Sequence, residues 1–351
     1  MSVNYKSIQW NRQKIVYDLI LVGLVALYIF LFRYIAEQID PYPSPDNFGL
    51  RIRAYGSAAF ILLHVILSIG PLSRLSPKFY PLLFNRRHTG VTMFALAVNH
   101  ARLVRFRYHG FGNLDPTTSL FVSNTNYFSL TGFPFEILGI VALAIFLFMA
   151  ATSHDFWLVN LTAPVWKALH MGVYLAYGLL VGHVVLGALQ SNRDPLLTIL
   201  VGVGLFWILG LHLITGWREM QRDRPDLAKT NAEYVEIGCI ADIPNNRAKV
   251  VTIGGERVAV FKYEDKISAV SNVCQHQNGP LGEGKIIDGC ITCPWHGYQY
   301  LPDSGASPPP FTEKIPTFDV KLEGDRILVK TIPHPPGTQV DPAIIPVEVT
   351  Q

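Results

Sequence analysis

The first 217 residues contain six long apolar stretches separated by polar segments, and this pattern limits what the chain can fold into. Each stretch has roughly 18 to 25 residues, enough for a helix to cross a hydrocarbon core of about 30 Å. The third stretch is the least apolar because several polar side chains interrupt it, and polar residues at membrane depth often have a functional role. The six predicted transmembrane helices lie near residues 15–33, 54–72, 89–106, 132–151, 165–189 and 195–216.

The distribution of Lys and Arg predicts the orientation of these helices. Eleven such residues lie in loops on the side of the two termini, and seven lie on the opposite side. Because cytoplasmic loops carry the excess of positive charge, both termini are predicted to be cytoplasmic. The first stretch lacks an evident cleavage signal and is expected to remain as an anchor. The sequence therefore predicts a multi-pass protein of the cell (inner) membrane, surrounded by lipid, with no nucleic-acid partner.

The composition changes sharply after Trp217, where the apolar stretches end. Residues 218–232 are charged and predict a linker. Residues 233–332 contain short alternating apolar segments between Gly, Asn and Asp turns, which is typical of antiparallel β-structure. Residues 333–351 form a Pro-rich tail that is expected to be mobile or to lie on the surface. The predicted fold class is multidomain: an all-α six-helix transmembrane bundle at residues 1–217, followed by an all-β domain. No convincing internal repeat is evident.

Two cysteines and two histidines in the β domain have metal-ligand spacing. Cys274 and His276 form a Cys-x-His pair, and Cys293 and His296 form a Cys-x-x-His pair after sixteen intervening residues. Two thiolates and two imidazoles suit a Cys2His2 zinc site. They also suit a [2Fe–2S] cluster with the cysteines on one iron and the histidines on the other. Both metals remain candidates from the ligand types alone.

The residues that flank these pairs resemble the cluster-binding loops of the Rieske family. The matching residues are Gly279 to Gly284, Pro294-Trp295 and Gly297. The resemblance implies a [2Fe–2S] cluster, and the lack of an extra cysteine in either loop implies the ferredoxin-like and oxygenase-like branch. Tyr298 stands where high-potential members have a serine that bonds a cluster sulfide. We therefore expect a potential in the lower part of the Rieske range of roughly −150 to +300 mV.

Four histidines lie well inside predicted transmembrane helices: His64, His100, His170 and His183. An unpaired imidazole in hydrocarbon is costly, so such a residue is usually bonded to a neighbour or binds a metal. In a chain with an iron–sulfur motif, four of them favour bis-histidine b-type haem. His170 and His183 are thirteen residues apart on one helix, about 20 Å along its axis. The predicted pairs are His100 with His183 and His64 with His170, for one haem or two.

The bundle also resembles a known family, the ferric-reductase-like transmembrane domain. The closest resemblance is to the branch that includes the haem-binding membrane subunit of the periplasmic methionine sulfoxide reductase system. His100, His170 and His183 match the haem-associated histidines of that family. His64 has no counterpart there, so His88 and His212 remain alternatives for the fourth ligand. The other matching segments are Arg86-Arg87-x-x-Gly90, Ala151-Thr152-Ser153 and Trp166-x-x-Leu169-His170-x-x-x-Tyr174.

Together these features predict a membrane oxidoreductase that passes electrons from a cytoplasmic donor to the cluster, then to haem, then to an extracytoplasmic acceptor. No nucleotide-binding or flavin-binding signature follows the bundle, so the donor is expected to be another protein or quinol. Two alternatives remain. Electrons could flow inward to a cytoplasmic oxygenase-type client, or the chain could be a redox sensor. No catalytic acid, base or nucleophile is assigned.

Overall fold

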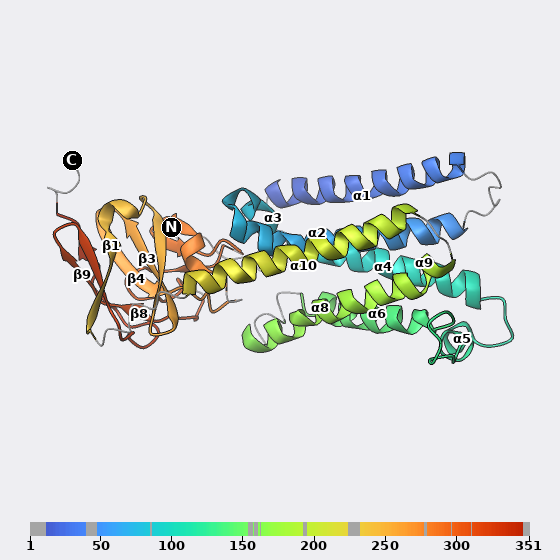
Figure 1. Ribbon diagram of the computed structural model, residues 1–351. Helices are drawn as coiled ribbons and strands as arrows, with labels where there is room; N and C mark the ends of the chain where they lie inside the picture. The colour runs from blue at the N-terminus through green and yellow to red at the C-terminus, as the bar shows by residue number, and fades with distance from the viewer. Residues whose placement is uncertain are drawn as a thin grey trace. The chain divides into compact units, whose positions relative to one another are not determined.

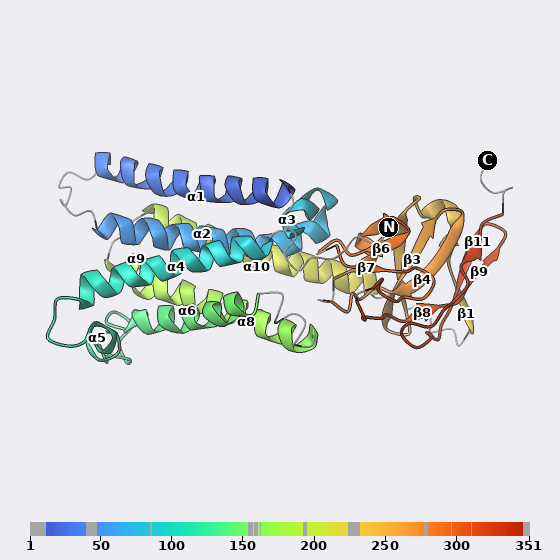
Figure 2. The ribbon, with the colours of Figure 1, turned by 180° about the vertical axis from the view of Figure 1, so that it is seen from behind.

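The chain divides into two compact units, one within Ile8–His212 and one that includes Leu213–Gln351. Each unit is described by itself (Figures 1 and 2). The computed structural model describes residues 12–39, 48–84, 86–153, 157, 161, 163–191, 195–223, 232–276, 279–295, 297–309 and 311–346.

The first unit is helical, as the apolar stretches predict. Six of the helices coincide with the six predicted stretches; four of them extend beyond the stretch, α6 begins three residues later, and α8 is shifted by two to three residues toward the N-terminus. These six are α1 (Arg12–Ile39), α2 (Phe48–Leu75), α4 (Arg86–His109), α6 (Phe135–Ala151), α8 (Ala163–Leu186) and α10 (Pro195–Asp223). The shorter helices of the described residues are η1 (Pro77–Phe79), α3 (Tyr80–Phe84), α5 (Pro116–Val122) and α9 (Ala188–Ser191).

The prediction of six membrane spans is not confirmed, although several apolar helices support a membrane protein. Within the described residues, four segments are long and apolar enough to cross a bilayer: Ile15–Ile39, Phe48–Leu75, Val165–Gln190 and Pro195–Gln221. Helix α6 has 17 residues, about 26 Å at 1.5 Å per residue, slightly less than a hydrocarbon core of about 30 Å. Helix α4 contains too many polar and basic residues to qualify by composition.

Two helical hairpins form the centre of the bundle. Helix α2 packs along α4, and α6 packs along α8 (Figures 1 and 2). Small and large side chains interlock between them, since Ala142 and Ala176 are fully buried together with Leu63. The core is therefore made mainly by α2, α4, α6, α8 and α10, while many apolar side chains of α1 remain exposed on the outside.

The β domain of the second unit consists of three small antiparallel sheets. Sheets β1-β10-β9 and β11-β4-β3-β2 enclose one apolar core, and the sheet β5-β6-β7 covers a second core. Strand β8 pairs with β4. The strands are β1 (Tyr234–Cys239), β2 (Arg247–Ile253), β3 (Glu256–Tyr263), β4 (Lys266–Ser271), β5 (Lys285–Ile287), β6 (Cys290–Thr292), β7 (Gln299–Tyr300), β8 (Thr317–Phe318), β9 (Val320–Glu323), β10 (Arg326–Lys330) and β11 (Ala343–Ile344).

The structure differs from the sequence prediction at both ends of this domain. Helix α10 continues to Asp223, so the first residues of the predicted linker are helical. The tail contributes β11, which pairs with Lys266 and Ile267 of β4. The Ile345 amide also donates to the Asp265 carbonyl. A Pro-rich composition did not reveal this strand, because its pairing partner lies far away in the sequence.

Candidate functional site

His100 and His183 face each other across the two hairpins. His100 lies on α4 and His183 on α8, and their ring centres are 6.3 Å apart with an angle of 88° between the planes. The structure thus brings together the two histidines of the first predicted pair.

Backbone carbonyls orient both imidazoles in the same way. His100 Nδ1 lies 2.9 Å from the Ile52 carbonyl oxygen, and His183 Nδ1 lies 2.9 Å from that of Phe135. A carbonyl accepts but cannot donate, so each Nδ1 carries the hydrogen. Each Nε2 therefore keeps its lone pair, which is the tautomer that a metal-binding imidazole needs.

A glycine on the neighbouring helix makes room for each ring. A Cβ at Gly56 would lie 2.8 Å from His100 Nδ1, and one at Gly139 would lie 2.9 Å from His183 Nδ1. Each histidine follows the residue that supplies its carbonyl by 48 positions, and each glycine lies four residues after that carbonyl. Each hairpin thus contains the same arrangement of a backbone carbonyl, a glycine and a histidine. The expectation of no internal repeat was wrong at the level of these positions.

The spacing of the two rings fits a haem between them. An imidazole nitrogen binds a first-row metal at about 2 Å and lies about 1.2 Å from its ring centre, so two axial imidazoles on one iron have centres roughly 6.4 Å apart. The observed 6.3 Å agrees with this value. His100 and His183 would therefore be able to hold the iron of one haem between them.

The second predicted pair has a different environment. His170 stacks on Trp166 with ring centres 3.7 Å apart, and its Nδ1 lies 3.0 Å from the Trp166 carbonyl oxygen. Its Nε2 is buried, and no hydrogen-bond partner is present among the described residues. His64 instead contacts Tyr177, whose hydroxyl lies 3.1 Å from His64 Nε2. Its Nδ1 lies 2.8 Å from the Phe60 carbonyl. Because protein atoms partner both His64 nitrogens, the geometry favours His170 over His64 as a metal ligand.

The two alternatives for the fourth ligand are also partnered. His88 Nδ1 lies 2.7 and 2.9 Å from the two carboxylate oxygens of Asp18. His212 Nε2 lies 3.1 Å from the Tyr174 hydroxyl, and its Nδ1 lies 2.9 Å from the Ile208 carbonyl. Neither contact indicates a metal-binding role.

In the β domain, short turns place the two cysteines of the predicted cluster. Cys274 follows β4 and Cys293 follows β6, and both are buried at 0% and 2% exposure. The Cys274 amide donates to the Gly279 carbonyl at 2.9 Å, and the Cys293 amide donates to the Tyr298 carbonyl at 2.8 Å. A Cβ at Gly279 would lie 2.7 Å from Cys293 Sγ, so glycine lets the first loop approach the second.

The histidine ligands are less completely described. His276 stacks on Tyr298 with ring centres 4.9 Å apart and planes within 8°. His296 lies outside the described residues. Among the residues that are described, no group of three His, Cys, Asp or Glu side chains has the geometry of a site for a single ion. Two buried thiols and a glycine between the loops nevertheless fit the cysteine half of a [2Fe–2S] site.

Tyr300 is a site residue that the sequence reasoning missed. Its hydroxyl lies 3.5 Å from Cys274 Sγ and accepts a hydrogen bond from the Gln275 amide at 2.9 Å. The hydroxyl of Tyr298, the tyrosine singled out in the sequence, donates to Glu313 instead. Residues 298 and 300 are two apart in an extended segment, which places them on the same side. This spacing was the signal that could have identified Tyr300.

Both tyrosines remain protonated. Burial, followed by the nearby Cys274 sulfur, raises the pKa of Tyr300 far above its usual value. Burial and the hydrogen bond to Glu313 raise the pKa of Tyr298 in the same direction. Tyr300 is therefore an O–H donor beside sulfur throughout the neutral pH range.

Comparison with known families agrees with the two-part organisation. Residues 55–181 match the family of the ferric reductase like transmembrane component, and residues 233–319 match the Rieske [2Fe-2S] domain. The chain is a ferric-reductase-like membrane domain fused to a Rieske domain. The likeness to the methionine sulfoxide reductase subunit stays a prediction.

Individual proteins that are similar to this chain come from several redox systems. The ferredoxin component of the alkene monooxygenase system of Xanthobacter autotrophicus is 29% identical over 117 residues, covering 33% of this chain and 96% of that protein. Cholesterol 7-desaturase nvd of Xenopus laevis is 27% identical over 180 residues, covering 39% of this chain and 40% of that protein. The solved ferredoxin of carbazole 1,9a-dioxygenase from Nocardioides aromaticivorans is 24% identical, covering 29% of this chain and all of that one, with a TM-score of 0.28.

The combination of these two domains determines the class of the protein. A Rieske domain supports a [2Fe–2S] cluster, and the apolar helices belong to a ferric-reductase-like membrane domain. The fusion is accordingly a membrane electron-transfer protein related to oxidoreductase components.

Proposed function

We propose that the fusion passes electrons between a cytoplasmic Rieske cluster and b-type haem in the bundle, toward an extracytoplasmic acceptor. Cys274, His276, Cys293 and His296 would hold the cluster. His100 and His183 would hold haem. When bound, both groups supply one-electron carriers, and the polypeptide sets their position and surroundings.

The observation that supports this proposal most directly is the His100–His183 pair. Two imidazoles in the same tautomer, each fixed by a carbonyl and a glycine, lie at the separation that one iron requires. Two unrelated structural histidines would not be expected to share the same carbonyl–glycine–histidine arrangement or to have ring centres 6.3 Å apart. The protein contributes fixed donor atoms, so little reorganisation accompanies a change in iron charge.

His170 is the residue that would hold a second haem. Its Nδ1 is fixed by a carbonyl, as in the first pair, and its Nε2 is buried without a hydrogen-bond partner in the described part of the chain. The residue thirteen positions before His183 is His170, whereas the residue thirteen positions before His100 is Arg87. The α2–α4 hairpin thus has an arginine at the position that corresponds to His170.

The proposed donor is a cytoplasmic redox protein or quinol, and the proposed orientation rests on the Lys and Arg distribution. Two fusions after Gln351, one to green fluorescent protein and one to alkaline phosphatase, test this orientation. A fluorescent first fusion and an inactive phosphatase fusion are expected for a cytoplasmic Rieske domain. Phosphatase activity without fluorescence would contradict it.

The decisive experiment measures iron, sulfide and haem in the purified full chain and titrates the optical and EPR signals against potential. His183→Ala is expected to lose haem and keep the EPR signal of the cluster. His296→Ala is expected to do the opposite. Zinc in place of iron, or a protein that stays colourless when haem is supplied, would refute the proposal.

Inward electron delivery to an oxygenase-type client is a second candidate. It is favoured by the similarity of the Rieske domain to the ferredoxin component of an alkene monooxygenase system. The measured potentials separate the two directions, since haem more negative than the cluster favours inward flow.

A further inference from the structure

His109 is a buried histidine to which the proposed function gives no role. It is the last residue of α4 and is 7% exposed. Its Nε2 is buried, and no hydrogen-bond partner for this atom is present in the described part of the chain. A buried polar atom without a protein partner is rare and costly, and in proteins such atoms often contact an ion or a water. His109 Nε2 is therefore available to a ligand.

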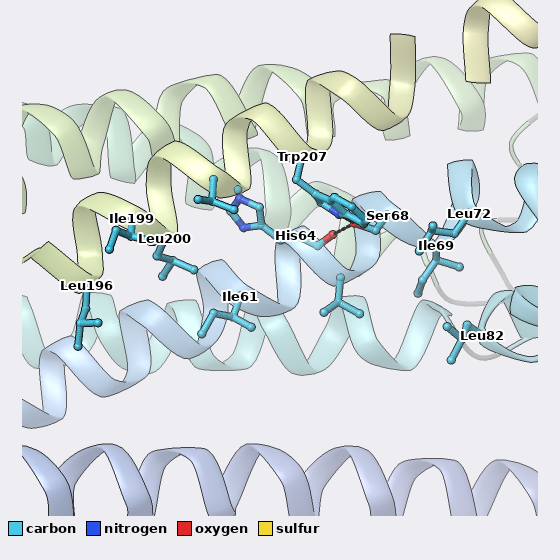
Figure 3. A pocket seen from close by; sticks show the side chains of 13 residues that line it. Ile61, His64, Ser68, Ile69, Leu72, Leu82, Leu196, Ile199, Leu200 and Trp207 are labelled. Carbon is cyan, nitrogen blue, oxygen red and sulfur yellow. Dashed lines mark hydrogen bonds between the residues drawn. The ribbon is translucent and has the colours of Figure 1, made fainter. Parts of the chain in front are cut away.

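An apolar groove between α2 and α10 provides a contrast, because its polar side chains are bonded within the protein. Figure 3 shows the Trp207 indole, whose Nε1 donates to the Ser68 hydroxyl at 2.9 Å. That hydroxyl donates to the His64 carbonyl at 2.7 Å, and both His64 ring nitrogens have protein partners. The groove has a volume of about 530 Å³ but offers no unsatisfied polar side chain to a ligand, whereas the end of α4 does.

A carboxylate lies near the unpartnered nitrogen of His109. Glu136 is in the first turn of α6, and its Oε1 is 3.6 Å from His109 Nε2. The other ring nitrogen, Nδ1, lies 2.9 Å from Ser119 Oγ of α5. This hydroxyl can accept the Nδ1 hydrogen, so that Nε2 keeps the lone pair that a metal ion requires. Side chains from α4, α5 and α6 thus meet at one place.

The separation of 3.6 Å between His109 Nε2 and Glu136 Oε1 distinguishes between three kinds of contact. A direct N–H···O hydrogen bond is about 2.7 to 3.2 Å long, so the separation is too long for one. A water molecule bonded to both atoms at about 2.8 Å, with about 105° between the bonds, would hold them roughly 4.4 Å apart. A first-row metal ion at about 2.1 Å from each atom would hold them roughly 3.6 Å apart at about 120°. The observed separation fits a shared metal ion.

The charges at this place also favour a cation. His109 ends a helix of 24 residues, and the C-terminal end of a helix carries partial negative charge. Glu136 lies in the first turn of its helix, where partial positive charge stabilises an ionised carboxylate. The Glu136 side chain is 22% exposed, so solvent reaches the carboxylate although His109 is buried. An ion from solvent would therefore meet the carboxylate first and then the imidazole.

We propose that His109 Nε2 and the Glu136 carboxylate bind a first-row divalent metal ion such as Zn²⁺. One imidazole and one carboxylate are ligand types that this ion accepts. A structural zinc site takes four protein ligands, whereas two leave the remaining positions to water. The ion is therefore exchangeable. The Ser119 hydroxyl positions the imidazole without contacting the ion.

The site lies next to the group that orients His183. Glu136 directly follows Phe135, whose carbonyl oxygen lies 2.9 Å from His183 Nδ1. A metal ion bound to Glu136 places positive charge near the proposed haem, which favours the reduced iron. This consequence rests on the proposed function, whereas binding of the ion does not.

Titration of Zn²⁺ into the full chain in zwitterionic nanodiscs, measured by calorimetry, tests the proposal. Glu136→Gln removes the charge and keeps the shape of the side chain, and it is expected to weaken binding roughly tenfold or more, as is His109→Ala. Ser119→Ala is expected to weaken binding about tenfold, because it removes the group that positions the imidazole. Glu37→Gln is the matched control, because Glu37 also lies 3.6 Å from a basic side chain, that of Arg33, which has no lone pair for a metal.

Saturable binding of Zn²⁺ that is weakened in Glu136→Gln and His109→Ala, and kept in Glu37→Gln, supports the site. Equal affinity of Glu136→Gln and the wild type would overturn it. No saturable binding by the wild type would mean that His109 and Glu136 form an ion pair only, which also overturns it. Haem and cluster content are measured on the same samples. Normal haem and cluster without Zn²⁺ binding refute only this inference, and Zn²⁺ binding by a chain that takes up no haem refutes only the proposed function.

Discussion

Replacing Tyr300 with Phe removes one hydroxyl from beside the proposed cluster and preserves the buried ring. That hydroxyl lies 3.5 Å from Cys274 Sγ and already accepts a hydrogen bond from the Gln275 amide. Because the amide supplies its own hydrogen, the phenol hydrogen remains available to the sulfur. Hydrogen bonds to cluster sulfur stabilise the more negative, reduced state. We therefore expect Tyr300→Phe to lower the midpoint potential of the cluster.

The size of the decrease follows from the strength of one such hydrogen bond. A hydrogen bond to a charged group contributes about 1.5 to 3 kcal/mol. For a one-electron couple, about 1.4 kcal/mol corresponds to about 59 mV. Only the difference between the oxidised and reduced states changes the potential, so the lower end applies, roughly 60 mV. Burial raises the pKa of Tyr300, so the phenol stays protonated and the decrease should be constant across the neutral pH range.

The assay is an EPR-monitored redox titration of the purified full chain. Tyr263→Phe is the matched control, because Tyr263 is also a buried tyrosine of the Rieske domain. Its hydroxyl bonds Ser268 Oγ at 2.9 Å instead of a sulfur atom. Its substitution should leave the potential unchanged. Equal midpoint potentials for Tyr300→Phe and the wild type, with an intact cluster signal, would refute the reasoning.

The bundle gives three further outcomes that spectroscopy can check. His183→Ala should lose haem absorbance and His64→Leu should retain it, and haem loss in the second variant would show that His64 is a ligand. Gly139→Ala places a Cβ 2.9 Å from His183 Nδ1 and should reduce haem content, whereas Gly178→Ala on α8, with nothing within 4 Å of the added Cβ, should not. The 88° angle between the His100 and His183 rings should give the strongly anisotropic low-spin EPR signal of perpendicular imidazoles, and a signal typical of parallel planes would contradict the arrangement.

The sequence predicted the elements of this protein well because their signals are local. Six apolar stretches became helices α1, α2, α4, α6, α8 and α10, and alternating segments became strands of the Rieske domain. The number of membrane spans was less predictable. Helix α4 lies where a span was predicted, but its composition is too polar to qualify as one. The strand at Ala343–Ile344 was not predicted, because its stability comes from pairing with a distant strand.

The site could be predicted only as far as residue types and spacing allow. His100 and His183 lie close together, as their positions toward the same side of the membrane led us to expect, and their role as haem ligands stays a prediction. The partner of His64 depends on the rotation of α2 about its axis, which periodicity does not determine, and the structure places Tyr177 beside it. The Tyr300 contact was missed because only Tyr298 was considered, although residues two apart in an extended segment lie on the same side.

The two hairpins show why the ends of the bundle are not equivalent. Toward α5, both hairpins supply a carbonyl, a glycine and a histidine, so two fixed imidazoles face each other. Toward α3, the α8 hairpin supplies His170 and the other supplies Arg87 at the corresponding position. A guanidinium remains protonated and does not bind iron. A haem held by His170 would therefore find no histidine at the corresponding position of the α2–α4 hairpin, and its spectrum should differ from that of a haem held by His100 and His183. Two identical bis-histidine signals per chain would require a different histidine as the second ligand, such as His64 on α2 or His88 on α4.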